Sequence, residues 1–161
     1  MTSPLDPLLA ELQSGQRLLG LDVGSKTVGL AISDRALAVA SPLETLRRGK
    51  FKADADAIKR VCAERNVGAL VVGLPVNMDG SEGPRCQSTR AFARNLREIG
   101  GIALPVVFWD ERLSSSAVER FLVGQADMSR QRRGEVVDKM AAAYILQGAL
   151  DALHHAKTRG G

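Results

Sequence analysis

Three carboxylates stand where this chain changes from one predicted element to the next. Asp22 ends an apolar run (RLLGLDV), Glu111 follows a second run (LPVVFWD), and Asp138 interrupts the apolar start of a helical segment (VVDKMAAAYI). Aspartate is depleted in strands, and a carboxylate among branched apolar residues must be hydrogen-bonded, metal-bound or protonated. Asp22 by itself favours a turn cap. Spacing alone slightly favours three separate roles in caps and salt bridges over one shared site.

If the three acids share a site, its chemistry is that of a hard divalent cation. His154 and His155 lie together near the C-terminus, and Cys62 and Cys86 are not in metal-ligand spacing, so we interpret the cysteines as reduced thiols. Carboxylates without such partners suit Mg²⁺ or Mn²⁺. Two such ions about 4 Å apart would hold the attacking and leaving oxygens of a phosphodiester and activate water.

Asp110 competes with Glu111 for a place in this site, because adjacent residues of a strand point to opposite faces. Only one of the two can join Asp22 if the strand continues to this point. The strand pattern itself leaves both open.

Positive charge is concentrated in one part of the chain. There are 22 Lys and Arg against 18 Asp and Glu, a net charge of +4. Residues 85–133 contain nine Arg and five acids, and nine minus five equals the whole excess. The planar guanidinium suits phosphate, and Arg90, Arg94 and Arg97 fall on one helical stripe. This segment predicts either a solvated basic surface or a patch that follows a phosphate backbone.

The elements that must position these side chains form a mixed pattern. Two apolar runs joined by Gly-Ser-Lys predict a hairpin at 17–34, and residues 36–45 predict a third strand in which Pro42 favours an edge position. A buried strand is expected at 69–73 and a further strand at 104–109. Helical periodicity predicts helices at 51–66, 85–99, 117–123 and 135–156. The polar loop at 74–84 is long for a simple connection, which is typical of a functional loop.

This order of elements predicts an α/β fold in which one mixed sheet carries helices on its faces. The length of 161 residues fits one domain at 17–156, with a leader at 1–16 and a tail at 157–161. No run is apolar and long enough to span a bilayer, and the N-terminus lacks the pattern of a signal peptide. We therefore expect a cytoplasmic protein without a membrane partner.

Four motifs make the chain resemble the YqgF/RuvX family of pre-16S rRNA nucleases, also described as Holliday-junction-resolvase-like. The motifs are LLGLDVGSKTVGLAISD at 18–34, VVGLPVNMDGSEGPR at 71–85, DERLSS at 110–115 and VVDKMAAAYIL at 136–146. The resemblance covers residues 18 to about 152. It implies a ribonuclease H-like fold with a mixed five-stranded sheet. Two features depart from the family: Lys139 follows the last acid, where a small residue is common, and the leader is extra.

The resemblance also implies the site residues. It makes Asp22, Glu111 and Asp138 the catalytic triad and the ligands of Mg²⁺ or Mn²⁺, and it favours Glu111 over Asp110. It places Gly73, Pro75, Asn77, Asp79 and Gly80 in a loop beside the site. Nucleic-acid contacts are expected from Lys26, Asn77, Asp79, Arg85, Arg90, Arg94 and Arg112.

The leading hypothesis is a metal-dependent endonuclease that processes the 5′ end of pre-16S rRNA, acting on precursor rRNA or ribosomal particles as a monomer or weak dimer. A resolvase of four-way DNA junctions would use the same triad but calls for a dimer. A non-catalytic RNA-binding factor is a further alternative. An actin-like or sugar-kinase-like ATPase also begins with an Asp-x-Gly hairpin, but it needs two such domains.

Overall fold

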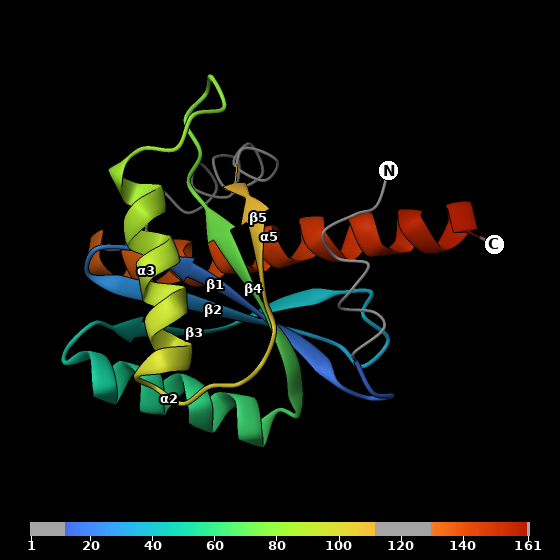
Figure 1. The fold of residues 1–161 in the computed structure, drawn as a ribbon, viewed down its shortest axis with the longest axis horizontal. Coiled ribbons are helices and arrows are strands. Elements are labelled where there is room, and N and C mark those ends of the chain that lie inside the picture. The colour runs from blue at the N-terminus through green and yellow to red at the C-terminus, as the bar shows by residue number, and fades with distance from the viewer. Residues whose placement is uncertain (1–11, 112–129, 161) are drawn as a thin grey trace.

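The computed structural model describes residues 12–111 and 130–160, with side chains described for 12–111 and 138–153 (Figure 1). Arg112 and the helix expected at 117–123 lie outside the described residues. The described elements are β1 (Arg17–Val23), β2 (Thr27–Ser33), β3 (Ala40–Arg47), α2 (Phe51–Glu64), β4 (Val67–Leu74), α3 (Pro84–Glu98), β5 (Val106–Asp110) and α5 (Arg130–Gly160).

The strands form one mixed sheet in the order β3-β2-β1-β4-β5. β1, β2 and β3 are antiparallel neighbours, whereas β4 and β5 run parallel to β1. The predicted hairpin is confirmed: its turn is closed by the Gly24 N–H, which donates to the Thr27 carbonyl at 2.8 Å. Pro42 lies in β3 at the edge of the sheet, where a missing N–H does not interrupt a ladder.

Alternation along the strands divides the core between two faces of the sheet. Leu19, Leu21 and their neighbours pack in one cluster with α2 and α3. Leu18, Val71 and their neighbours pack in a second cluster with α5, which crosses the other face of the sheet (Figure 1). β4 is buried at all eight positions because it lies inside the sheet with a helix layer on each face, as its apolar sequence predicted.

Glycines on the α5 face allow the helix to lie unusually close to the sheet. A Cβ at Gly29 would overlap the backbone carbonyl of Asp138, and a Cβ at Gly20 would lie 2.9 Å from the Cβ of Leu146. Gly29 is the β2 partner of Asp22. The absence of a side chain at Gly29 therefore lets the backbone of Asp138 come down next to the end of β1.

The last helix is longer than the sequence pattern indicated. α5 begins at Arg130 rather than at residue 135 and continues through Gly134, so Asp138 lies in its third turn and not in its first. The expectation of a first-turn carboxylate was wrong because the polar residues before Gly134 resemble a loop. Among the described residues, no helix has the length and apolar character needed to cross a membrane.

Candidate active site

Asp22 and Glu111 meet across β4, at the edge of the sheet where the parallel strands end. Asp22 is the sixth residue of β1, and Glu111 directly follows β5. Between them lies Gly73 of β4, and a Cβ placed on Gly73 would lie 2.9 Å from Oε1 of Glu111. The missing side chain at Gly73 thus leaves the space that the Glu111 carboxyl occupies.

The electrostatics of Asp22 show that three carboxylates converge. Burial, followed by the charge of Glu111, a hydrogen bond with Glu111 and the charge of Asp138, raises the pKa of Asp22 from 3.8 to about 8. Arg85 acts in the opposite direction and lowers this pKa. Near neutral pH the Asp22 carboxyl is therefore largely protonated, and it is hydrogen-bonded to Glu111. The structure brings together the three acids that the sequence pattern singled out, with Arg85 beside them.

The choice between Glu111 and Asp110 follows from strand alternation. Val106 and Phe108 pack with the α2 and α3 cluster, whereas Val107 and Trp109 pack with the α5 cluster. By the same alternation, Asp110 belongs to the face of Val106 and Phe108, and Glu111 belongs to the face of Val107 and Trp109. Glu111 is therefore on the face of Asp22 and is its hydrogen-bond partner.

Asp138 is oriented by a residue that the sequence analysis did not identify. The Thr27 hydroxyl at the start of β2 donates a hydrogen bond of 2.6 Å to Oδ2 of Asp138. The sequence signal that could have indicated this contact is strand alternation. Thr27, Gly29 and Ala31 share one face of β2, and a row of small residues is typical of a strand against which a helix packs closely.

The donor chemistry of the three acids fits a hard divalent cation. Carboxylate oxygens are the ligands that Mg²⁺ and Mn²⁺ prefer, and the raised pKa of Asp22 marks negative charge that nearby cations do not fully balance. Within the part of the chain that is described, however, no three His, Cys, Asp or Glu side chains converge closely enough to enclose a metal ion. Asp138 bonds to Thr27 in this arrangement.

The loop after β4 is shaped by its own polar side chains. Asp79 Oδ1 accepts hydrogen bonds from the Ser81 N–H at 2.9 Å and from the Ser81 hydroxyl at 2.6 Å, and the Asn77 amide donates to Ser81 Oγ at 3.1 Å. Gly80 has a φ of 88°, which favours glycine. Pro75 belongs to this loop, but Gly73 is a residue of β4. The nucleic-acid contacts expected of Asn77 and Asp79 stay predictions.

The arginines of α3 differ in their surroundings. Arg90 makes two hydrogen bonds to the Glu82 carboxylate, at 2.8 and 2.9 Å, and its guanidinium lies 4.7 Å from the centroid of the Phe108 ring. Arg94 is exposed further along α3, about 13 Å from Arg85 at 1.5 Å per residue. Arg85 therefore lies at the carboxylates, Arg90 holds the preceding loop, and the phosphate contacts expected of Arg90 and Arg94 stay predictions.

Comparison with known proteins gives a consistent family and fold. The family model RuvX, described as Holliday junction resolvase, matches residues 16–152. A Roseobacter denitrificans protein named "Putative pre-16S rRNA nuclease" is 61% identical over 145 residues, which is 90% of this chain and 88% of that protein. A protein of the same name from Rhodospirillum centenum is 61% identical over 149 residues, 91% of this chain and 79% of that protein.

Solved structures of low sequence identity share the fold. RuvC of T. thermophilus in complex with a Holliday junction substrate has a TM-score of 0.55 and 14% identity, over 86% of this chain and 96% of that chain. The fowlpox virus resolvase in complex with Holliday junction DNA has a TM-score of 0.53 and 9% identity, over 86% of this chain and 99% of that chain. The predicted single α/β domain with a mixed five-stranded sheet is confirmed.

Proposed function

We propose, from the premise that this chain belongs to the RuvX family, that it is a metal-dependent nuclease that processes the 5′ end of pre-16S rRNA in the cytoplasm. The observation that carries the proposal is that Glu111 and Asp138, from two other parts of the chain, lie close enough to Asp22 to raise its pKa. Three buried or half-buried acids at one point destabilise the fold unless they serve a ligand. A polyanionic substrate with a divalent cation is the ligand that fits them.

Each residue of the site has a distinct role in this proposal. Asp22, Glu111 and Asp138 would hold Mg²⁺ or Mn²⁺, which when bound activates water and offsets the charge that develops on the phosphate. Thr27 orients Asp138 through its hydroxyl. Arg85 carries a fixed positive charge next to Asp22 and would bind a phosphate oxygen of the substrate.

The preference for an RNA end over a four-way junction rests on three features. The curated relatives are named for pre-16S rRNA. Aromatic residues make up only 4% of the chain, so recognition would depend on shape and phosphate spacing rather than on stacked bases. A single group of three acids per chain cuts once per binding event, which suits the trimming of a precursor end.

The test is a cleavage assay on a precursor 16S rRNA fragment in Mg²⁺, in Mn²⁺ and in EDTA. We expect cleavage at the 5′ boundary with a divalent cation, and none in EDTA or with Asp22→Asn. RNA binding without cleavage under either metal would instead support the non-catalytic RNA-binding factor.

A resolvase activity is the second candidate, because the family model is described as a Holliday junction resolvase and the fold is that of RuvC. Paired symmetric incision requires two copies of the site. Symmetric nicking of a four-way DNA junction, faster than cleavage of precursor RNA at matched salt and metal, together with a stable dimer in light scattering, would establish this alternative.

A further inference from the structure

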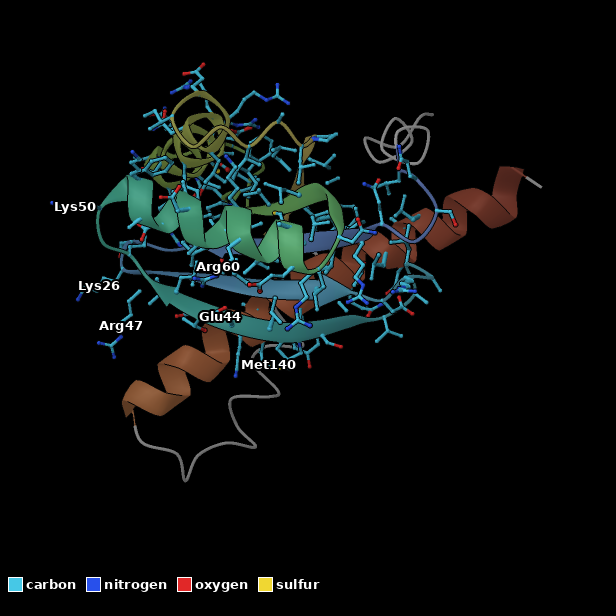
Figure 2. All side chains as sticks on the ribbon, turned by 90° about the horizontal axis from the view of Figure 1, so that it is seen from below. Lys26, Glu44, Arg47, Lys50, Arg60 and Met140 are labelled. Carbon is cyan, nitrogen blue, oxygen red and sulfur yellow. The ribbon has the colours of Figure 1, made fainter. Side chains whose placement is uncertain are left out.

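Two turns carry exposed cations at the same edge of the sheet as the carboxylates. The first turn joins β1 to β2 and contains Lys26. The second joins β3, whose last residue is Arg47, to α2, and it contains Lys50. The two turns are adjacent because Thr27 pairs with Arg47 in the β2–β3 ladder. Figure 2 shows Lys26, Arg47 and Lys50 projecting outward at one end of the molecule, and all three are exposed. We call these three residues the hairpin-side cations.

The backbone that carries the hairpin-side cations is held by Arg48. The Arg48 N–H donates to the Lys26 carbonyl at 2.8 Å, and its guanidinium donates to the Gly24 carbonyl at 2.7 Å. The same guanidinium lies 5.0 Å from the centroid of the Phe92 ring of α3. One side chain thus connects both turns to each other and to the core.

A buried carboxylate holds the second turn from the other side. Asp54 is 7% exposed, and both its oxygens accept from the Gly49 N–H at 3.2 Å. The cations therefore extend from a fixed backbone, so binding does not require the turns to be ordered first.

This surface is connected directly to the candidate active site. Lys26 precedes Thr27, whose hydroxyl bonds to Asp138. The segments 23–33 and 46–53, which form the two turns and their flanks, contain no Asp or Glu. These two segments therefore carry net positive charge. It lies next to a group of acids that would bind a metal rather than repel a phosphate chain.

We propose that Lys26, Arg47 and Lys50 bind the phosphate backbone of the RNA substrate on the β-hairpin side of the carboxylates, while Arg85 binds it at the carboxylates themselves. The proposal rests on the proposed function, whose substrate it positions. A count of charges along the sequence does not single out Arg47 and Lys50, because all the net positive charge of the chain lies in residues 85–133. The fold places this separate group of cations beside the same site.

The test compares the triple variant Lys26→Gln, Arg47→Gln, Lys50→Gln with a matched control, Arg35→Gln, Lys59→Gln, Arg65→Gln. The control removes the same charge from exposed positions at the opposite edge of the sheet, after β2 and toward the end of α2. Binding of a precursor 16S rRNA fragment is measured by fluorescence anisotropy over a range of salt concentrations. EDTA is present so that cleavage does not enter the measurement.

We expect the triple variant to bind about 10- to 100-fold more weakly at low salt and to lose about two to three from the slope of log K against log salt. The control should change the slope by less than about one. The charge-keeping variant Lys26→Arg, Arg47→Lys, Lys50→Arg should restore the slope, which excludes a folding defect as the cause. Equal losses in the triple variant and the control, or an unchanged slope, would overturn the proposal.

The outcomes for this surface and for the proposed function are separable. If the triple variant loses the salt slope but the wild type never cleaves RNA, the proposed nuclease activity is refuted and the proposed binding surface stands. Cleavage by the wild type with an intact slope in the triple variant would refute the binding surface alone. A slope lost for a four-way DNA junction but not for RNA would refute the assignment of RNA as the ligand.

Discussion

Replacing Asp22 by asparagine should stabilise the metal-free protein while it abolishes cleavage. The Asp22 carboxyl is buried beside Glu111 and Asp138, and these surroundings raise its pKa from 3.8 to about 8. An acid whose pKa is higher in the folded state binds a proton on folding. Its contribution is therefore most favourable below pH 4 and is lost as the pH rises toward 8. Asparagine has nearly the same shape and carries no charge at any of these pH values.

The size of the effect follows from the two pKa values. The difference between 3.8 and about 8 is about four pH units, which corresponds to about 6 kcal/mol in the limit where Asp22 alone carries the change. Asp22 interacts strongly with Glu111, so part of this free energy belongs to the pair and the part that belongs to Asp22 alone is smaller. We expect Asp22→Asn to raise the free energy of unfolding by about 2–4 kcal/mol at pH 8 and by less than about 1 kcal/mol at pH 4.

The measurement is urea unfolding in EDTA at several pH values between 4 and 8, with Asp56→Asn as the control. Asp56 is an exposed acid on α2, so its replacement removes one charge without touching the site. Adding Mg²⁺ or Mn²⁺ should stabilise the wild type more than Asp22→Asn, because the variant lacks one of the proposed ligands. A variant as stable as the wild type at pH 8, or a gain that is the same at pH 4, would show that the carboxylates do not repel one another as argued.

Three further changes probe the same site. Glu111→Gln should lower the cleavage rate by more than about 100-fold, and adding Asp138→Asn should cause little further loss, whereas Asp110→Asn should retain activity. An active Glu111→Gln variant together with an inactive Asp110→Asn variant would assign the role to Asp110 instead. Thr27→Val should lower the cleavage rate by about 10-fold without changing RNA affinity, whereas Thr27→Ser should cleave at a rate close to that of the wild type. Identical cleavage rates in the two variants would show that the hydroxyl does not orient Asp138. Gly29→Ala should lower the free energy of unfolding by more than about 2 kcal/mol in thermal or urea unfolding, because the added Cβ overlaps the Asp138 carbonyl. If this variant is as stable as the wild type, α5 can move away from the sheet without cost.

Much of the sheet could be predicted from the sequence because it depends on local periodicity. The hairpin around Gly24 and the alternation that separates Glu111 from Asp110 are properties of neighbouring residues. Strand alternation alone left both acids open, and the family resemblance decided between them. The structure shows the physical reason, which is the free space above Gly73.

Features that depend on register between distant segments could not be predicted. The Thr27–Asp138 hydrogen bond joins residues 111 positions apart, and nothing in either segment alone indicates the other. The start of α5 was also missed, because helix propensity is weak at Gly134 and the packing of the whole helix on the sheet outweighs it.

The close contact between α5 and the sheet explains how the fold tolerates a site that opposes its own stability. Gly20 and Gly29 let the helix backbone approach β1 and β2, and Leu146 and Leu150 are fully buried in the resulting cluster. Burying a leucine side chain contributes about 2 kcal/mol, so a few such residues are comparable to the cost of the converging acids. The helix that carries Asp138 into the site is therefore also the element whose burial offsets the repulsion there. Because residues of α5 other than Asp138 supply the packing, the acids can be neutralised one at a time without loss of the fold, whereas a change that lifts α5 removes both Asp138 and the packing.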